Sequence, residues 1–443
     1  MGEIQKIKYA LVGAGSRARM FIDPLATIYQ QHGELVALVD PNPGRLNLHK
    51  RTLIEEMGYG EVNTYPTEEF DRMVKETKPD VVIVTTVDAV HHEYIIRAME
   101  LGCDVITEKP ITTDATKCNA IMDTVRRTGR RLRVAFNYRW SPGTTRVREV
   151  LSEGTIGDLV HVDMEYWLNT SHGADYFRRW HREKQNSGGL IVHKATHHFD
   201  LVNWWIDAIP DSVYGVGRLA FYGRQNAEAR GETVAYDRYS GQETSSDPFA
   251  IDISIDSRMK ELYMDNEKYD GYLRDRNVFS DGITIEDSMS LVVKYRTGVV
   301  LNYSLNAFLP REGFRVAFNG TKGRIEYEEN HSSNIVAADS KKTGMESSWS
   351  PRLVVYPMFG EQFEVEIPLA KGGHGGGDRL LQRQIFDVSA EPDVLKRDAG
   401  HQQGAASAVI GFAANNSFDN GEVISISEIC PALDGANRLS ELE

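Results

Sequence analysis

A glycine-rich turn close to the start of the chain constrains the fold more than any other feature. The apolar run Ile7–Val12 is followed by six residues, 13–18, that read GAGSRA and match the pattern GxGxxA. In this pattern the first glycine permits a tight turn, the second lets the backbone approach a pyrophosphate, and the small last residue lets a helix pack closely on a strand. The pattern predicts a strand, turn and helix that bind a dinucleotide, with these cofactor contacts: Gly13, Gly15, Ser16, Arg17 and Ala18.

The residue that ends the second apolar run indicates which dinucleotide is bound. Residues 35–39 form this run, and Asp40 follows it 25 residues after Gly15, close to the spacing of about 20 that is usual for such sites. A carboxylate there accepts both ribose hydroxyls of NAD and repels the additional phosphate of NADP. Arg45 lies close enough to contact a phosphate. The sequence predicts NAD in preference to NADP, with Asp40 and Arg45 at the cofactor.

The first 140 residues alternate between short apolar runs and longer amphipathic stretches. Three more apolar runs, 81–84, 103–107 and 132–136, follow the two above, and helical patterns such as 91–101 and 116–128 separate them. Short apolar strands joined by helical crossovers form parallel sheets that are covered on both faces. Residues 1–140 are therefore predicted to form a doubly wound Rossmann domain with a parallel sheet.

From residue 141 onward the pattern is that of a second α/β domain, predicted for residues 141–443. Strand-like runs recur with short turns between them, which predicts a large, mostly antiparallel open sheet. A helix is expected over residues 193–205, and the polar stretch 224–282 is expected to be a functional or mobile loop system. The predicted strands are 160–167, 213–222, 289–295, 299–305, 314–319 and 324–327.

Charge and composition exclude several classes of protein. The 443 residues carry a net charge of −14, whereas binding to nucleic acid or an anionic membrane needs a basic surface. No apolar run approaches the ~20 residues that span a bilayer. The three cysteines, Cys103, Cys118 and Cys430, are too few and too scattered for a disulfide framework. A cytoplasmic location is expected, with no nucleic-acid or membrane partner.

Further motifs follow the predicted strands or begin the predicted helix of the second domain. Glu108-Lys109-Pro110 comes directly after the run 103–107, and residues 86–91, which read TVDAVH, follow the run 81–84. Trp180 stands eight residues before Gly188, and residues 188–200 read GGLIVHKATHHFD. The crevice of an open α/β sheet lies at the carboxyl ends of its strands, so Asn137 and Arg139, which follow the last run, are also expected there.

In these motifs the chain resembles the glucose–fructose oxidoreductase, inositol dehydrogenase and rhizopine catabolism family (Gfo/Idh/MocA). Residues 108–110 match its EKP motif, 86–91 its TPNxxH loop and 188–200 its GGxxxDxGxHxxD helix, with Asp88 at the asparagine position and His193 at the aspartate position. The resemblance implies a cis bond before Pro110, a lysine between nicotinamide and substrate, and a homodimer or homotetramer. With Asn137, the expected cofactor contacts become Thr86, Asp88, His91, Glu108, Lys109, Asn137 and Trp180.

The residue types at these positions suit the oxidation of a secondary alcohol. Such a reaction removes a hydride from carbon and a proton from oxygen, so it needs a base within hydrogen-bond reach and gains from a nearby cation. We expect His197 to be the base and Lys109 the electrostatic stabiliser, with His193 as a third catalytic residue. The substrate is predicted to be a small carbohydrate, namely a sugar, polyol or sugar derivative. Its expected contacts are Lys109, Arg139, His193, Lys194, His197 and His198.

Three alternatives remain at this stage. Some members of the resembled family retain NAD and use it for redox-neutral glycoside cleavage by oxidation and elimination, and the extra basic residues would suit added proton transfers. Metal-dependent hydrolysis is disfavoured, because the HxxxH spacing of His193 and His197 carries Lys194 where zinc peptidases have a glutamate base. A non-catalytic NAD sensor is disfavoured because both Lys109 and His197 are present. No metal is predicted.

Overall fold

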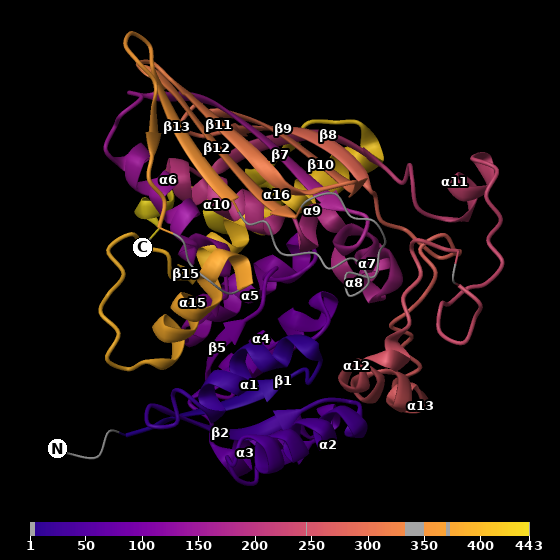
Figure 1. The fold of residues 1–443 in the computed structure, drawn as a ribbon. Coiled ribbons are helices and arrows are strands. Elements are labelled where there is room, and N and C mark those ends of the chain that lie inside the picture. Colours follow the sequence, from indigo (N-terminus) through magenta and orange to yellow (C-terminus); the bar gives the residue numbers. More distant parts are fainter. Residues whose placement is uncertain (1–4, 245, 333–349, 369–372, 443) are drawn as a thin grey trace.

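Two β-sheets organise the chain, which is described as a computed structural model over residues 5–244, 246–332, 350–368 and 373–442. The first sheet lies in the N-terminal half, and the second forms a broad layer on the opposite side of the molecule, with helices between them (Figure 1). A Rossmann-type unit with a parallel sheet and a C-terminal α/β unit with a mostly antiparallel sheet are thus both present, as predicted.

The first sheet has the strand order β15-β6-β5-β4-β1-β2-β3. All its neighbouring strands pair in parallel except β15 and β6. The sequence analysis missed β3 and β15, because neither has the apolar run by which the other strands were recognised. The strands are β1 (Ile7–Val12), β2 (Gly33–Val39), β3 (Asn63–Tyr65), β4 (Val81–Val84), β5 (Asp104–Thr107), β6 (Leu132–Val134) and β15 (Ala399–Gly400).

Helices cover both faces of this sheet, which explains why its strands are apolar without alternation. One face packs against α3, α4 and α5, and the other against α1, α2 and α15. The last of these helices comes from near the C-terminus, so a segment of the predicted second domain, residues 377–400, completes the first sheet. The helices are α1 (Arg19–Ala26), α2 (Pro43–Arg51), α3 (Phe70–Thr77), α4 (His91–Glu100), α5 (Ala115–Thr128) and α15 (Gly377–Phe386).

The second sheet has the strand order β14-β13-β12-β11-β7-β10-β9-β8-β16. Its pairs are antiparallel except for β7 with β10 at the centre. Residues 296–299 connect β9 to β10 and residues 321–322 connect β11 to β12, which are the short turns expected between antiparallel strands. The strands are β7 (Leu159–Asn169), β8 (Pro210–Arg218), β9 (Ser288–Tyr295), β10 (Val300–Leu309), β11 (Glu312–Gly320), β12 (Gly323–Ser332), β13 (Ser350–Pro357), β14 (Phe363–Val365) and β16 (Ile424–Ser425).

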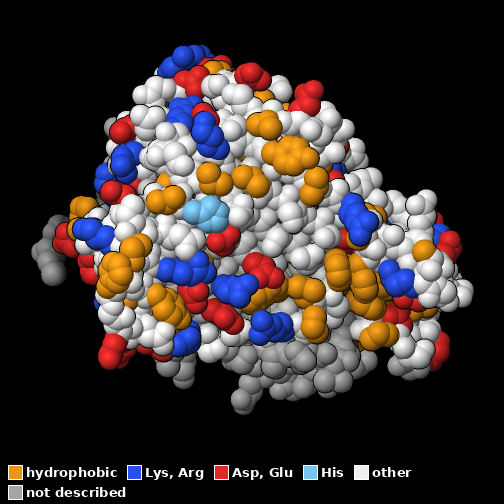
Figure 2. Space-filling view, turned by 90° about the horizontal axis from the view of Figure 1, so that it is seen from above, with side chains coloured by type: hydrophobic (Ala, Val, Ile, Leu, Met, Phe, Trp, Pro, Cys, Tyr) orange, Lys and Arg blue, Asp and Glu red, His pale blue; other side chains and the backbone are white. Residues whose placement is uncertain are grey.

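The two faces of the second sheet differ in burial. Alternate residues of β9 and β10 are buried against helices α6, α10 and α16, which lie between the sheets (Figure 1). On the outer face, hydrophobic side chains lie exposed among polar and charged ones (Figure 2). The exposed hydrophobic residues of this face include Tyr214, Val216 and Val292. The remaining helices are α6 (Pro142–Ser152), α7 (His172–Arg178), α8 (Lys184–Ser187), α9 (Leu190–His193), α10 (Thr196–Ile206), α11 (Arg224–Ala229), α12 (Ser257–Leu262), α13 (Glu267–Asp270), α16 (His401–Asn420) and α17 (Ile426–Ile429).

Two predictions for the second half need correction. The helix expected over residues 193–205 is interrupted, because α9 ends at His193 and α10 begins at Thr196. The polar stretch 224–282 contains α11, α12 and α13, and the latter two reach across to the N-terminal unit beside α2 (Figure 1). Of the helices that the structure describes, none is both long and apolar enough to cross a bilayer.

Candidate active site

The carboxyl ends of four parallel strands open into one cavity of about 560 Å³, a size typical of small-molecule sites. Val12, Asp40, Thr85 and Glu108, at the ends of β1, β2, β4 and β5, form one wall, and residues of the second half form the other. The structure brings these predicted site residues together around the cavity: Gly13, Gly15, Ser16, Arg17, Asp40, Arg45, Thr86, Asp88, His91, Glu108, Lys109, Trp180, His193, Lys194 and His197.

The glycine turn has the geometry that a dinucleotide requires. Gly13 has a φ of +96°, and a Cβ there would lie 2.6 Å from the Thr85 backbone, so only glycine fits. A Cβ on Gly15 would meet nothing closer than the Tyr263 hydroxyl, 3.6 Å away. The Ser16 N–H, at the start of the helical segment, donates to that hydroxyl at 3.0 Å. The turn therefore presents backbone donors to an oxygen acceptor in the cavity, which fits the phosphates of NAD.

Asp40 and Arg45 belong to a charged network at the end of β2. The Asp40 carboxylate accepts the N–H of Ala14 at 2.7 Å and that of Asn42 at 2.8 Å. Arg45 donates to Asp40 at 3.0 Å and forms a second ion pair with Asp270, from the end of α13. Two carboxylates thus hold one guanidinium where a ribose would lie.

A chain of hydrogen bonds links Lys109 to Asp88 through His193. The Lys109 Nζ lies 3.3 Å from His193 Nε2 and 3.1 Å from the His193 carbonyl oxygen, and His193 Nδ1 lies 2.5 Å from Asp88 Oδ2. The rings of Tyr176 and His181 pack against the His193 ring. Two of the positions that depart from the resembled family's motifs, Asp88 and His193, are therefore bonded to each other.

Burial dominates the electrostatics of this chain. It lowers the pKa of Lys109 to about 8, against the opposing charges of Asp88 and Glu108. It also lowers the pKa of His193, with the charge of Lys109 acting in the same direction. A neutral His193 that donates from Nδ1 to Asp88 and accepts at Nε2 from Lys109 satisfies every group in the chain.

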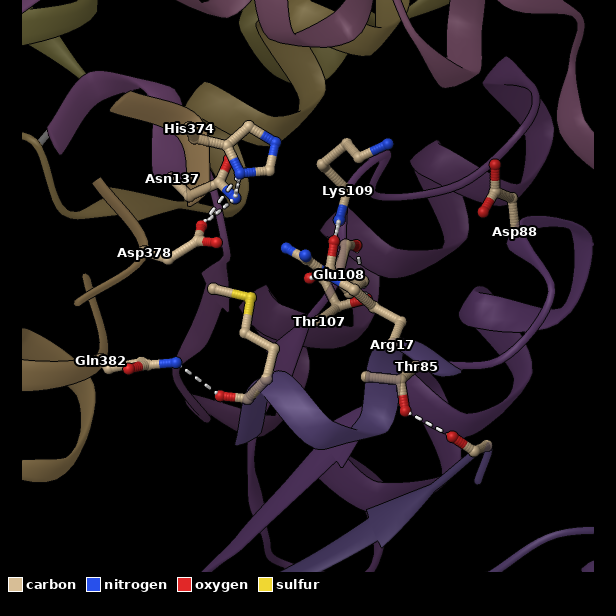
Figure 3. A network of polar contacts seen from close by, with 12 residues as sticks. Arg17, Thr85, Asp88, Thr107, Glu108, Lys109, Asn137, His374, Asp378 and Gln382 are labelled. Atoms are coloured by element: carbon tan, nitrogen blue, oxygen red, sulfur yellow. Dashed lines mark hydrogen bonds and ion pairs between the residues drawn. The ribbon is translucent and has the colours of Figure 1, made fainter. Parts of the chain in front are cut away.

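The peptide bond between Lys109 and Pro110 is cis, as the resemblance implies. The His91 ring holds this loop, since its nitrogens lie 2.8 Å from the Pro110 carbonyl oxygen and 3.3 Å from that of Thr86. Glu108 accepts from Arg17 Nε at 2.5 Å, which positions the arginine at the cavity beside Lys109 (Figure 3).

His197 lies on the cavity wall opposite the loops that follow the parallel strands. Its ring packs against those of Phe136, Tyr138 and His374, and its Nδ1 is buried without a hydrogen-bond partner among the described residues. Burial lowers its pKa, and the charge of Lys109 lowers it further. His197 is therefore neutral near pH 7, with a nitrogen that can accept a proton or a hydrogen bond.

Four predicted site residues do not line the cavity. Ala18 is fully buried where the first helix packs on the sheet, which agrees with its predicted packing role. The Asn137 amide donates to Asp378 at 2.6 Å and also contacts His374 (Figure 3). His198 contacts the Tyr303 hydroxyl at 2.7 Å and stacks on another tyrosine ring.

Arg139 is the fourth of these residues, and it forms a buried ion pair with Asp200. It donates to both carboxylate oxygens of Asp200, at 2.8 Å and 2.6 Å, and each side chain is 1% exposed. The two side chains are bonded to each other, so Arg139 does not line the cavity, where the sequence placed it.

Other cavity residues were not predicted, and most come from parts of the sequence without a recognised motif. His374 lies within the glycine-rich stretch 371–378, of which residues 371 and 372 lie outside the described residues. Each reaches the cavity through the tertiary fold. The residues missed are His172, Tyr176, Arg179, His181, Tyr263, Asp270 and His374.

Family models match most of the chain. Residues 7–136 match the oxidoreductase family with an NAD-binding Rossmann fold (GFO_IDH_MocA), and residues 148–387 match the C-terminal α/β domain of the same family. The two matches are separated by residues 137–147 and together include the described strands of both sheets except β15 and β16.

Individual relatives agree with these models. A Bacillus subtilis (strain 168) protein named "Putative oxidoreductase YteT" is 35% identical over 437 residues, which cover 94% of this chain and 97% of that protein. The D-glucoside 3-dehydrogenase of Escherichia coli (strain K12) is 31% identical over 156 residues, 34% of this chain and 41% of the enzyme. The aldose-aldose oxidoreductase of Caulobacter crescentus has the same fold, with a TM-score of 0.62 at 18% identity over 95% of this chain and 100% of that structure.

Proposed function

The chain belongs to the Gfo/Idh/MocA oxidoreductase family, and on this premise we propose that it is an NAD-dependent dehydrogenase of a sugar, polyol or sugar derivative. It oxidises a secondary hydroxyl or catalyses the reverse reduction. The observation that carries the proposal is the position of the Lys109 amine, which lies in the same cavity as the glycine turn and the Asp88–His193 pair. The glucoside dehydrogenase activity named for one relative supports the substrate class.

Lys109 is the residue that exchanges the proton of the substrate hydroxyl. Bound NAD supplies the hydride acceptor. A neutral Lys109 amine has two N–H groups. They donate hydrogen bonds to His193 Nε2 and to the His193 carbonyl oxygen. The lone pair of the amine is then free to accept the proton of the substrate hydroxyl. A pKa of about 8 suits this exchange near neutral pH. The hydrogen bonds thus favour Lys109 as base, the reverse of the assignment made from sequence.

The other two predicted catalytic residues support Lys109 in this proposal. His193 is a positioning residue, because it holds the amine and transmits the charge of Asp88 to it. The negative charge of Asp88 favours the protonated amine, so it strengthens Lys109 as a base. His197 faces the cavity as a neutral imidazole and binds the reacting hydroxyl or its neighbour.

The proposed activity is tested by NADH formation. The purified protein with added NAD is expected to produce NADH from at least one sugar or polyol of a broad panel, measured by absorbance at the nicotinamide band. The protein without substrate is the blank. If no compound yields NADH and no carbonyl compound consumes it, the dehydrogenase proposal is wrong.

We also propose that the cofactor is NAD and not NADP. A 2′-phosphate on the ribose would approach Asp40 and Asp270, and the charge of Arg45 is already shared between these carboxylates. Asn42 donates to Asp270 at 3.1 Å and fixes the second carboxylate in place. The arrangement therefore repels additional negative charge.

Removal of one carboxylate is expected to weaken this discrimination. The variant Asp270→Asn releases Arg45 from one ion pair, so the ratio of the NADP dissociation constant to that of NAD should fall about tenfold, the effect of ~1.4 kcal/mol. Fluorescence titration with each reduced cofactor measures the ratio. Asp265→Asn, an exposed acid in the same segment paired with Lys260, is the matched control. An unchanged ratio in Asp270→Asn would contradict the proposed role.

A second candidate function is redox-neutral glycoside cleavage with retained NAD, and one observation favours it. Residues 257–272, which we call the strap, cross from the second half to the cofactor side of the cavity beside α2 (Figure 1). Tyr263 accepts from Ser16, Asp270 pairs with Arg45, and Glu261 pairs with Arg51. A strap held by three such contacts slows the exchange of a cofactor beneath it. Nicotinamide that stays with the protein through exhaustive dialysis, together with glycoside cleavage without added NAD, would support this candidate over the dehydrogenase.

We further propose that copies of the chain associate through the outer face of the second sheet into a homodimer or homotetramer. The exposed hydrophobic residues Tyr214, Val216 and Val292 lie on this face over the strands β8 and β9 (Figure 2). Burial of such a face removes apolar surface from water and leaves the cavity open on the other side of the sheet.

A further inference from the structure

Lys194 is a buried ammonium group that has no ionic partner among the described residues. It is 4% exposed and lines the cavity between α9 and α10. Within the part of the chain that the structure describes, no carboxylate lies within 4.0 Å of its Nζ, and Nζ makes no hydrogen bond. Nζ lies over the Tyr166 ring, 5.0 Å from its centroid. A charge in such a position is costly unless something pairs with it.

The acidic groups around this part of the cavity are each engaged elsewhere. Asp88 is bonded to His193, and Glu312 lies 2.7 Å from the Nδ1 of His172. Burial lowers the pKa of Lys194, and the charge of Glu312 only partly opposes this. The charge of Glu312 therefore favours the protonated form of Lys194, but no carboxylate among the described residues contacts its Nζ.

We propose that Lys194 binds a carboxylate of the substrate, so that the substrate is an acidic sugar, such as a uronic acid or its glycoside. This inference rests on the proposed function and narrows its substrate class. One ammonium balances the single charge of a carboxylate, whereas a phosphate ester carries about −1.5 to −2 and would keep an uncompensated charge in a buried site. Lys109 takes the reacting hydroxyl, and Lys194 fixes the orientation of the ring.

Calorimetric titration of the NAD-saturated protein tests the proposal without a need for turnover. The titrants are D-galacturonate with D-galactose, D-glucuronate with D-glucose, and the methyl glycosides of each. At least one acidic sugar is expected to bind about 30-fold or more tightly than its neutral counterpart, which is the range found for a buried charge pair. The methyl ester of that acid, which keeps the shape but not the charge, should bind like the neutral sugar.

Replacement of the lysine is expected to remove the preference. Lys194→Met should bind the acidic and the neutral sugar within about threefold of each other, because the ammonium no longer distinguishes them. Lys194→Gln serves as a second variant if the methionine protein does not fold. Lys75→Met, which removes an exposed lysine in α3, is the matched control and should keep the full preference.

The outcomes separate this proposal from the proposed function. Equal binding of acidic and neutral sugars, no binding of any acidic sugar, or a preference that persists in both Lys194 variants would each overturn the carboxylate site. Oxidation of neutral sugars at the same rate as acidic ones would also overturn the carboxylate site. The dehydrogenase proposal would then remain correct. Acidic sugars that bind through Lys194 but never exchange a hydride with NAD would leave the site correct and the dehydrogenase proposal wrong.

Discussion

Replacement of Lys109 by methionine is expected to lower kcat by about 10³-fold to 10⁴-fold, the range for loss of a general base together with its electrostatic contribution. Methionine keeps most of the length of the side chain but has no proton acceptor of comparable basicity. His193 and Asp88 would remain, but they are bonded to each other, and burial lowers the pKa of His193, which makes it a weaker base than the amine. Steady-state kinetics with the best substrate of the panel measure the loss.

Two further variants show whether the loss is chemical. Lys117→Met removes a lysine paired with Asp114 on α5 and should leave kcat unchanged. Asp88→Asn keeps the shape of the loop but removes the charge that raises the pKa of Lys109. Because oxidation needs the neutral amine, its rate should rise with pH through about 8 in the natural protein, and the midpoint should move to lower pH in Asp88→Asn. A midpoint that does not move would show that Asp88 does not act on Lys109.

The cofactor half of the site was predictable because its determinants are local. The turn at Gly13 and Gly15 and the carboxylate of Asp40 depend on residues within one strand–helix–strand unit. Strand-like runs of four to ten residues likewise identified five strands of the first sheet and six of the second, but not β13, β14 or β16. Strands such as β15 were missed, because two residues at the edge of a sheet need no apolar pattern when a neighbouring strand supplies the pairing.

The substrate half was less predictable because its contacts join distant segments. Asp88 and His193 are each unusual for their motifs, and the sequence alone offered no physical reason for the histidine. In the structure the carboxylate and the imidazole are hydrogen-bonded across 105 residues of chain. The position of the strap at the cofactor side could not be predicted for a similar reason. The contact of Asp270 with Arg45 depends on how the polar insertion folds back onto the N-terminal unit.

The place of Arg139 in the sequence does not determine which group it contacts. An arginine after the last parallel strand is well placed for the crevice, but a buried aspartate on α10 competes for it. Asp200 is 1% exposed and its pKa is raised by burial, which Arg139 opposes. The pair therefore joins the two halves of the molecule and does not line the cavity.

The variant Arg139→Met is accordingly expected to lower the free energy of unfolding by about 3–5 kcal/mol, the cost of a buried charge left without its partner. Methionine retains the packing of the side chain against the rings of Phe136 and Trp204, so the loss should come from the uncompensated Asp200. Urea denaturation followed by tryptophan fluorescence measures it.

The double variant Arg139→Met with Asp200→Leu distinguishes a charge effect from a packing effect. Because it removes both charges and fills the site with apolar atoms, it should recover most of the lost stability. Its KM for the substrate should equal that of the natural protein, since neither residue lines the cavity. A double variant as unstable as the single one would mean that packing, or the Arg139 hydrogen bond to the Lys396 carbonyl oxygen, carries the effect. A raised KM in a stable double variant would instead indicate that Arg139 contacts the substrate, as the sequence predicted.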